Sequence, residues 1–174
     1  MTYIDVHCHI DILENIEQII KEAKNSNVKI IVTAGINHET NRKSIELSKK
    51  FQEIKTALGI YPDEAIKMSD KEIEKEIEFI KSNRNNIVAV GEVGLDKTYK
   101  DFEKQKMVFK KMILLAKELD VPLIIHSRKA EHETIEILEQ MNAKKVVMHC
   151  FSGKKSLVEK IQKNKWYLSI PSNV

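Results

Sequence analysis

Histidines and one glutamate stand at the carboxyl ends of short apolar runs in this sequence. Each run is typical of a strand, and each polar residue follows its run directly, as His126 follows Ile124-Ile125. Imidazole and carboxylate groups are the usual protein ligands of zinc and similar divalent ions. Buried polar groups need partners, and one metal site would satisfy all of them together. The residues that we predict as metal ligands on this ground are His7, His9, Glu92, His126 and His149.

The first pair, His7 and His9, is well spaced to bind one ion. Side chains alternate between the two faces of a strand, so these imidazoles point the same way, about 7 Å apart at the backbone. Cys8 lies between them and points the other way, and Cys150 is expected to point away from His149 for the same reason. We therefore predict both cysteines to be small packed apolar residues rather than zinc ligands.

Each part of this pattern has a simpler interpretation when it is taken alone. A single buried histidine is more often hydrogen-bonded in a core than bound to metal. Gly91 and Gly94, which flank Glu92, would by themselves indicate only a tight turn. The joint occurrence of these residues at several strand ends favours the metal site. The two other histidines, His38 and His132, lie in charged helical surroundings, and we expect both to be surface residues.

Short runs rich in β-branched residues alternate with amphipathic helical patterns along the chain. Most runs are continuously apolar, as in Lys29-Ile30-Ile31-Val32, which is typical of parallel strands covered on both faces. The helical patterns include a capping box at Ser69 and Glu72 and a long apolar stripe over 102–119. Strands are predicted at 3–9, 28–35, 54–61, 87–92, 121–126, 145–149 and 166–170.

This alternation is compatible with two α/β architectures, a doubly wound open sheet and a TIM-type (β/α) barrel. The functional residues of such a barrel come from the carboxyl ends of several strands, which is where the predicted ligands stand. We therefore predict a TIM-type (β/α) barrel that is truncated after its seventh strand. Residues 1–174 are expected to form a single metal-binding barrel domain whose C-terminal βα unit is missing.

The composition is that of an ordinary globular chain. Its 174 residues are enough for one domain with a sizeable core. A net charge of +3 permits an anionic partner without requiring one. The sequence has neither a basic leader nor an apolar run of roughly 18 to 20 residues, so we expect no secretion signal and no membrane segment. Two cysteines suit a reducing compartment, and the expected location is the cytoplasm.

Four segments together resemble the TatD family of metal-dependent deoxyribonucleases, which are amidohydrolase-like barrels. The segments occur in the order and spacing of that family, and the resemblance runs over the whole of 1–174. They are Asp5-Val6-His7-Cys8-His9, Gly91-Glu92-Val93-Gly94-Leu95-Asp96, Ile125-His126-Ser127-Arg128 and His149-Cys150-Phe151-Ser152-Gly153.

The resemblance implies a site for two divalent ions of zinc, manganese or magnesium. His7 and His9 would hold one ion, and Glu92 would bridge it to the other and serve in catalysis. His126 and His149 would hold that second ion. Two ions about 3.5 to 4 Å apart can activate a water molecule and neutralise the charge that develops on a phosphate.

Two further residues are candidates for contacting substrate. Arg128 stands beside a predicted ligand and could donate two parallel hydrogen bonds to a phosphate, although a surface ion pair is an equally simple interpretation. The family has Gly-x-His-Pro where this chain has Gly59-Ile60-Tyr61-Pro62, so Tyr61 offers a phenol in place of a histidine. Lys97-Thr98-Tyr99 also departs from the aromatic residue that commonly follows Leu-Asp in the family.

The family also places an aspartate at the end of its eighth strand, as a metal ligand and base, and no residue here matches it. An eight-stranded barrel takes about 250 residues. Open edges on the first and seventh strands would favour aggregation. Either the sequence is a fragment of a longer protein, which is the interpretation we favour, or something else covers these edges.

The leading functional hypothesis is a deoxyribonuclease that removes nucleotides from single-stranded or frayed DNA ends with a metal-activated water. The same site could instead hydrolyse an amide or ester such as an aminoacyl-tRNA. A third hypothesis, of another class, is a catalytically inactive metal-binding fragment or scaffold. The sequence predicts no particular oligomeric state.

Overall fold

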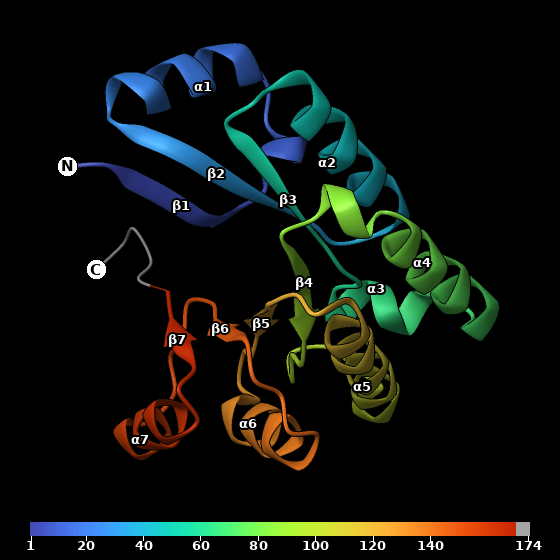
Figure 1. Cartoon of the computed structure of the whole chain (residues 1–174). Coiled ribbons are helices and arrows are strands. Elements are labelled where there is room, and N and C mark those ends of the chain that lie inside the picture. Colours follow the sequence, from blue (N-terminus) through green and yellow to red (C-terminus); the bar gives the residue numbers. More distant parts are fainter. Residues whose placement is uncertain (170–174) are drawn as a thin grey trace.

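Seven parallel strands form one curved sheet in the computed structural model, which describes residues 1–169. Their order in the sheet is their order in the chain, and each neighbouring pair is parallel (Figure 1). The carboxyl ends of all these strands therefore lie on one rim. The strands are β1 (Tyr3–Cys8), β2 (Val28–Gly35), β3 (Ile54–Leu58), β4 (Ala89–Gly94), β5 (Leu123–His126), β6 (Val146–Met148) and β7 (Tyr167–Leu168).

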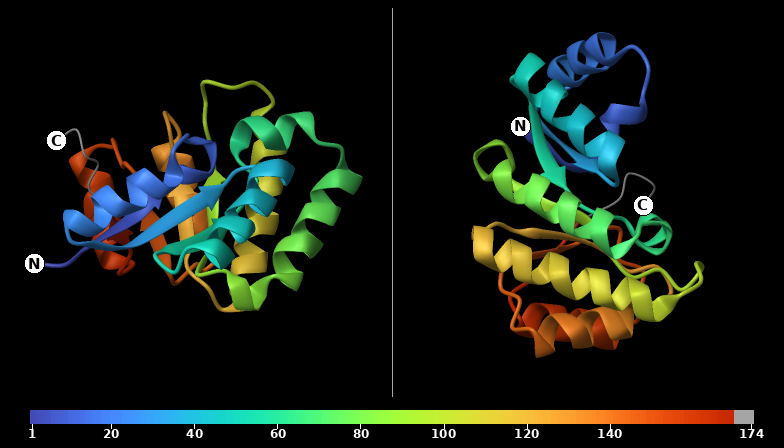
Figure 2. Two further views of the ribbon diagram at one scale, coloured as in Figure 1. Left: turned by 90° about the horizontal axis from the view of Figure 1, so that it is seen from above. Right: turned by 90° about the vertical axis from the view of Figure 1, so that its right-hand side faces the viewer.

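Helices connect successive strands and lie outside the curved sheet, as the views in Figures 1 and 2 agree. A sequential strand order with helices on the outer side is the arrangement of a (β/α) barrel rather than of a doubly wound sheet. The helices are α1 (Ile16–Asn25), α2 (His38–Lys50), α3 (Pro62–Lys67), α4 (Asp70–Ser82), α5 (Phe102–Leu119), α6 (Glu131–Gln140) and α7 (Lys155–Lys163), with short 3-10 turns η1 (Ile10–Ile12) and η2 (Arg84–Asn86).

The predicted strands are all present, although most are shorter than the apolar runs that indicated them. The second strand has the predicted bounds, whereas the third ends three residues earlier, at Leu58. Of the predicted seventh strand only Tyr167 and Leu168 are paired with β6, and Ile170 lies outside the described residues. The fourth strand is displaced rather than shortened, since the predicted range of 87–92 becomes Ala89–Gly94. Shifts of one or two residues are expected because strand bounds depend on the last ladder hydrogen bond and not on the apolar pattern.

Local capping interactions fix where several helices begin. Ser69 accepts a hydrogen bond from the Glu72 amide at 3.4 Å, and the Glu72 carboxylate accepts one from the Ser69 amide at 2.7 Å, so the predicted capping box is confirmed. A second box, formed by Asn37 and Thr40, begins α2. This second capping box fixes the path of the chain directly after β2, on the rim where the candidate ligands lie.

The largest core cluster packs the middle strands against the outer helices. Every residue of β4 is buried, and the long helix α5 presents Phe109, Met112 and Ile113 to this core, each no more than 1% exposed. Burial of that extent contributes roughly 1.5 to 3 kcal/mol for each large apolar side chain. The centre of the sheet is therefore its best-supported part.

The two outer strands of the sheet, β1 and β7, are its least covered part. Tyr3, Ile4 and Val6 of β1 are 52%, 54% and 44% exposed, and Tyr167 of β7 is 72% exposed. The open side between these strands carries both the N-terminus and the end of β7 in Figure 1. The predicted fold class, a TIM-type α/β fold, is confirmed, with seven parallel strands in an open, curved sheet among the described residues. Among residues 1–169, the helices are all too short or too polar to cross a membrane.

Candidate metal centre

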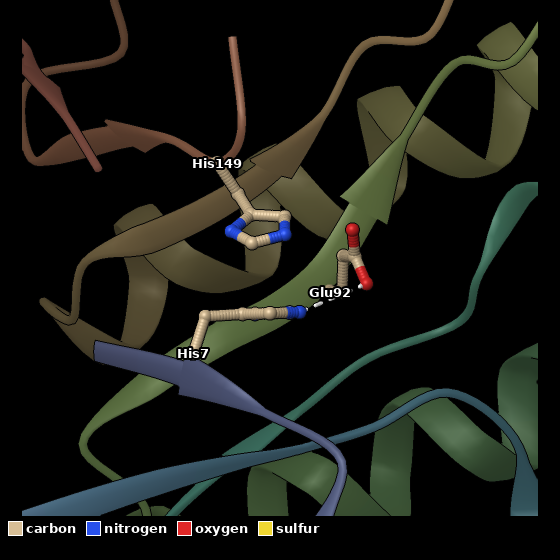
Figure 3. Close-up of side chains that lie close together, drawn as sticks. All are labelled: His7, Glu92 and His149. Atoms are coloured by element: carbon tan, nitrogen blue, oxygen red, sulfur yellow. Dashed lines mark ion pairs between the residues drawn. The ribbon is translucent and has the colours of Figure 1, made fainter. Parts of the chain in front are cut away.

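The five predicted ligands meet at the carboxyl rim of the sheet. His7 lies in β1, and His9 follows that strand directly. Glu92 lies in β4, His126 is the last residue of β5, and His149 follows β6. The imidazoles surround the buried Glu92 carboxylate, as Figure 3 shows for His7 and His149. The strand-end pattern therefore identified residues that are distant in sequence and adjacent in space.

The two oxygens of the Glu92 carboxylate face different imidazoles. Oε2 lies 3.3 Å from Nε2 of His7 and 3.3 Å from Nε2 of His9. Oε1 lies 3.0 Å from Nδ1 of His126. The carboxylate thus stands between the histidines of β1 and the histidine of β5, with one oxygen directed at each side.

These separations fit side chains that share a metal ion as ligands. Two ligands that each bind one ion at about 2.1 Å lie roughly 3.0 to 3.4 Å apart for octahedral or tetrahedral angles. The nitrogen-to-oxygen distances around Glu92 are 3.0 to 3.3 Å. Imidazole nitrogen with carboxylate oxygen is also the donor set of zinc and manganese sites. The residues therefore fit a divalent cation in both donor type and spacing.

The hydrogen bond of the second His9 nitrogen gives independent support for a cation here. Nδ1 of His9 lies 2.8 Å from the Ala34 carbonyl oxygen. A carbonyl only accepts, so Nδ1 carries the proton, and in the neutral ring the lone pair of Nε2 faces the Glu92 oxygen. Two lone pairs facing each other at 3.3 Å repel unless a positive charge lies between them. A bound proton or a metal ion would supply that charge.

The ionisation of the site follows from this crowding. Burial alone would raise the pKa of Glu92, but hydrogen bonds from the surrounding imidazoles outweigh it and hold that pKa far below its usual range. The hydrogen bond to Glu92 raises the pKa of His9. Burial opposes the charge on His126, yet Glu92 and Asp96 together raise its pKa. Without a metal, protons on these rings balance the carboxylate.

His149 differs from the other candidate ligands. Its ring lies against that of His7, with centroids 3.7 Å apart, and its Nδ1 lies 3.3 Å from the Ser169 hydroxyl. Burial and the neighbouring imidazole of His7 lower the pKa of His149 to about 4. The ring is therefore neutral at neutral pH and needs to lose no proton to bind a metal. Donor atoms of His7, Glu92 and His149 lie within 4.8 Å of one another and could hold one ion.

Two glycines beside Glu92 permit the close approach of β5, rather than marking a tight turn. A side chain at Gly91 would place its Cβ 2.7 Å from Cβ of Ile124. Gly94 has φ +149, and a Cβ there would overlap the His126 carbonyl. Both positions lie inside β4. The missing side chains thus let His126 lie beside Glu92.

The two cysteines have different environments. Cys8 is half-buried and packs, as predicted, against an apolar cluster that includes Ile10 of η1 and Ile31 of β2. Burial raises the pKa of its thiol to about 12. Cys150 is exposed, so the prediction that it packs as an apolar residue is wrong. Strand alternation does not apply to it, because it lies after β6 in a left-handed conformation (φ 43), with its amide donating to the Ser169 hydroxyl.

A pocket of about 630 Å³ opens above the candidate ligands. Tyr61 and Arg128 both line it. The Tyr61 hydroxyl lies 3.2 Å from Nε2 of His126, and burial, followed by the charge of Glu92, raises the pKa of Tyr61. Arg128 is exposed, and its positive charge lies close enough to Tyr61 to oppose this rise in the pKa of the phenol. Both predicted substrate-contacting residues are thus at the mouth of the site.

Asp96 is the residue at this site that sequence reasoning did not single out. Its side chain is buried, and Oδ2 lies 2.9 Å from Nε2 of His126. The signal was present, since a carboxylate follows a strand that already supplies Glu92. Of the remaining histidines, His38 and His132 have side chains 73% and 58% exposed and lie outside the site, as expected.

Comparison with known proteins identifies the relatives of this chain. Residues 4–174 match the family described as TatD related DNase. An uncharacterized metal-dependent hydrolase of Methanocaldococcus jannaschii is 35% identical over 175 residues, covering 99% of this chain and 68% of that protein. A human protein named deoxyribonuclease TATDN3 is 28% identical over 187 residues, covering 98% of this chain and 68% of its own length.

A solved structure agrees with these sequence relatives. The TatD homolog YjjV of Escherichia coli superposes with a TM-score of 0.86 at 28% identity, covering 95% of this chain and 66% of that structure. The chain thus spans about two thirds of the length of the relatives that it matches. On the strength of the family match, the sequence relatives and the shared fold, the chain belongs to the TatD family of metal-dependent hydrolases.

Proposed function

We propose that the chain carries the two-metal centre of a deoxyribonuclease that removes nucleotides from DNA ends. One observation carries the proposal furthest, namely the division of the Glu92 carboxylate between two sets of imidazoles. A carboxylate with one oxygen on each side is the arrangement expected of a bridging ligand. We assign His7 and His9 to one ion, and His126 to the other.

His149 is assigned to the ion on the side of His126, in line with the family pattern. Its ring lies on that of His7, which is also compatible with a place near the first ion. Its neutral state at neutral pH suits either place, because no proton has to leave before a metal binds.

The reaction needs activation of water and neutralisation of a phosphate that gains negative charge. A pair of divalent ions supplies both when bound. The protein holds the ligand side chains in position. Glu92 holds the two sides of the site at a fixed separation, and the backbone carbonyl of Ala34 fixes the orientation of His9. Arg128 at the pocket mouth offers a planar, permanently charged group for a phosphate oxygen.

DNA is proposed as substrate on three grounds. A human relative is named a deoxyribonuclease. The chain is mildly basic, with a net charge of +3, which suits an anionic polymer. The pocket lies on an open rim, with Tyr61 and Arg128 beside the candidate ligands, so that a single strand end can enter. Location in the cytoplasm stays a prediction.

The test is release of nucleotides from end-labelled single-stranded DNA by the full-length protein. We expect activity that a chelator abolishes and that added Mn²⁺ or Zn²⁺ restores. Glu92→Gln keeps size and removes charge, and it is expected to lower the rate by about 100-fold or more. Glu118→Gln, an exposed glutamate on α5, is the matched control and should leave the rate unchanged. Cleavage that persists in chelator would contradict the proposal.

Hydrolysis of an amide or ester at the same site is the second candidate. It is favoured by Tyr61, whose hydroxyl contacts His126 where the family pattern has a histidine. The same preparation assayed on aminoacyl-tRNA and on DNA separates the two, because only one substrate should be consumed at a rate sensitive to Glu92→Gln. Turnover of either substrate by residues 1–174 alone would rule out an inactive scaffold.

A further inference from the structure

His126 lies between two carboxylates, one on each ring nitrogen. Nδ1 faces Oε1 of Glu92 at 3.0 Å, and Nε2 faces Oδ2 of Asp96 at 2.9 Å. Glu92 has the role of a bridging ligand in the proposed function. Asp96, fully buried behind the ring, has no assigned role.

The position of Asp96 is fixed by its own hydrogen bonds. Oδ1 accepts from the Thr98 amide at 2.8 Å and from the Thr98 hydroxyl at 2.5 Å. Gln105 of α5 accepts from the Asp96 amide at 2.9 Å and donates to the Asp96 carbonyl at 3.1 Å. Only Oδ2 is left to face the imidazole. A carboxylate held this firmly can determine which nitrogen of the ring carries a proton.

The other candidate ligands have weaker partners on their second nitrogen. His9 donates to a neutral carbonyl, that of Ala34, and His149 faces the hydroxyl of Ser169. Nδ1 of His7 is buried without a hydrogen-bond partner among the described residues. An anionic partner orients a metal-binding imidazole and raises its basicity more than a neutral one does. His126 is therefore the ligand that the protein controls most strongly.

We propose that Asp96 is a positioning residue that accepts the Nε2 proton of His126 and so keeps Nδ1 unprotonated toward Glu92, ready to bind a divalent cation. The inference rests on the proposed metal centre and deepens it. It makes His126 an Nδ1 ligand, whereas His7 and His9 present Nε2 to Glu92.

The substitution Asp96→Asn separates this role from simple packing. The Thr98 amide and hydroxyl both donate, so they fix the new amide oxygen at the Oδ1 position. The amide NH₂ then faces His126 and donates to Nε2, which transfers the ring proton to Nδ1 and blocks metal binding there. Asp96→Ala removes the partner without imposing the wrong tautomer. If Asp96 only filled space, the isosteric Asn would be the milder change.

The first measurement is calorimetric titration of the full chain with Zn²⁺. We expect the affinity to fall from wild type to Asp96→Ala and to fall further in Asp96→Asn, by about 10- to 100-fold overall. Asp101→Asn, an exposed aspartate in the same loop that caps α5, removes the same charge away from the ring and should bind like wild type. Weaker binding by the Ala variant than by the Asn variant would overturn the proposal.

The second measurement reads the tautomer directly, from long-range proton–nitrogen NMR correlations of the protein in excess Zn²⁺ at neutral pH, where a cation would separate Nδ1 of His126 from the Glu92 carboxylate. His126 should carry its proton on Nε2 in wild type and on Nδ1 in Asp96→Asn. Tyr61→Phe tests the other group near Nε2 and should leave the proton on Nε2. An unchanged tautomer in Asp96→Asn would overturn the proposal. Failure of the full-length protein to cleave DNA would instead count against the proposed function, because neither measurement depends on turnover.

Discussion

The two sides of the candidate metal centre differ in how firmly the fold supports them. Glu92 and His126 come from β4 and β5, which are buried in the main core and backed by α5. His7 and His9 come from β1, an outer strand whose first four residues are exposed. We call these the β4–β5 side and the β1 side. Both contribute candidate ligands to one site, but only the first lies in the main apolar core, whereas the end of β1 packs on a smaller cluster.

This difference suggests that the two sides are held in place by different interactions. The β4–β5 side has its geometry built into the fold, with Asp96 fixing the ring of His126. The β1 side depends on the site itself, because the contacts of His7 and His9 with Glu92 join an exposed strand to the buried centre. A cation at Glu92 would therefore also serve to fasten β1.

The largest expected difference is in stability. Ile125 of β5 is fully buried, so Ile125→Ala should lower the free energy of unfolding by about 2 to 5 kcal/mol. Ile4 of β1 is 54% exposed, and Ile4→Ala should cost less than about 0.5 kcal/mol. Urea denaturation of the two variants measures both changes in the free energy of unfolding. Equal losses would show that the β1 side is packed as firmly as the β4–β5 side.

The next effect is the pH dependence of stability with and without metal. The raised pKa values of His9 and His126 mean that the folded chain binds their protons more tightly than the unfolded chain does. This stabilisation is complete below the unfolded value of about 6.5 and is lost as pH rises through the raised values. A metal ion replaces these protons, so binding strengthens as pH rises.

The measurement is urea unfolding at several pH values from 6.5 upward, in chelator and in excess Zn²⁺. The free energy of unfolding should fall with pH in chelator and rise with pH in zinc. His149 acts in the opposite sense, because its pKa is lowered to about 4 in the folded chain. The unfolded chain therefore binds this proton more tightly, and the folded chain loses stability only as pH falls below about 6.5. Parallel pH profiles in the two conditions would contradict the assignment of His9 and His126 as ligands.

The smallest expected effect concerns the support of His149. Ser169→Ala removes the hydroxyl that faces Nδ1 of His149 and accepts from the Cys150 amide. A neutral hydroxyl orients a ligand less strongly than a carboxylate does, so zinc affinity should fall by less than about tenfold. Zinc titration of Ser169→Ala and of Asp96→Asn under the same conditions compares the losses of zinc affinity in the two variants. A larger loss for Ser169→Ala than for Asp96→Asn would contradict the view that Asp96 gives its histidine the stronger support.

The convergence of the five candidate ligands could be predicted because parallel strands place their carboxyl ends on one rim. Continuous apolar runs located β4 to β6, and the polar residue after each run pointed to the site. The finer arrangement could not be predicted in this way. Asp96 lies in a loop whose path depends on Gln105 of α5, and no periodicity in the sequence reports such a contact.

Cys150 shows where the strand rule ceases to hold. The alternation of side chains predicts that it is buried behind His149, but β6 ends at Met148 and the chain then turns through a left-handed residue. The packing of His149 on His7 was equally hidden, because it joins a residue after β6 to one in β1 across the open side of the sheet. Contacts of this kind depend on the curvature of the sheet rather than on any local pattern.

The central claim, that Glu92 bridges two metal ions, is tested most directly by anomalous diffraction from crystals of the chain grown with Zn²⁺. We expect two zinc peaks about 3.5 to 4 Å apart, one beside each oxygen of Glu92, with Nδ1 of His126 bound to one of them. A single peak among His7, Glu92 and His149, with His126 still hydrogen-bonded to Glu92, would contradict it.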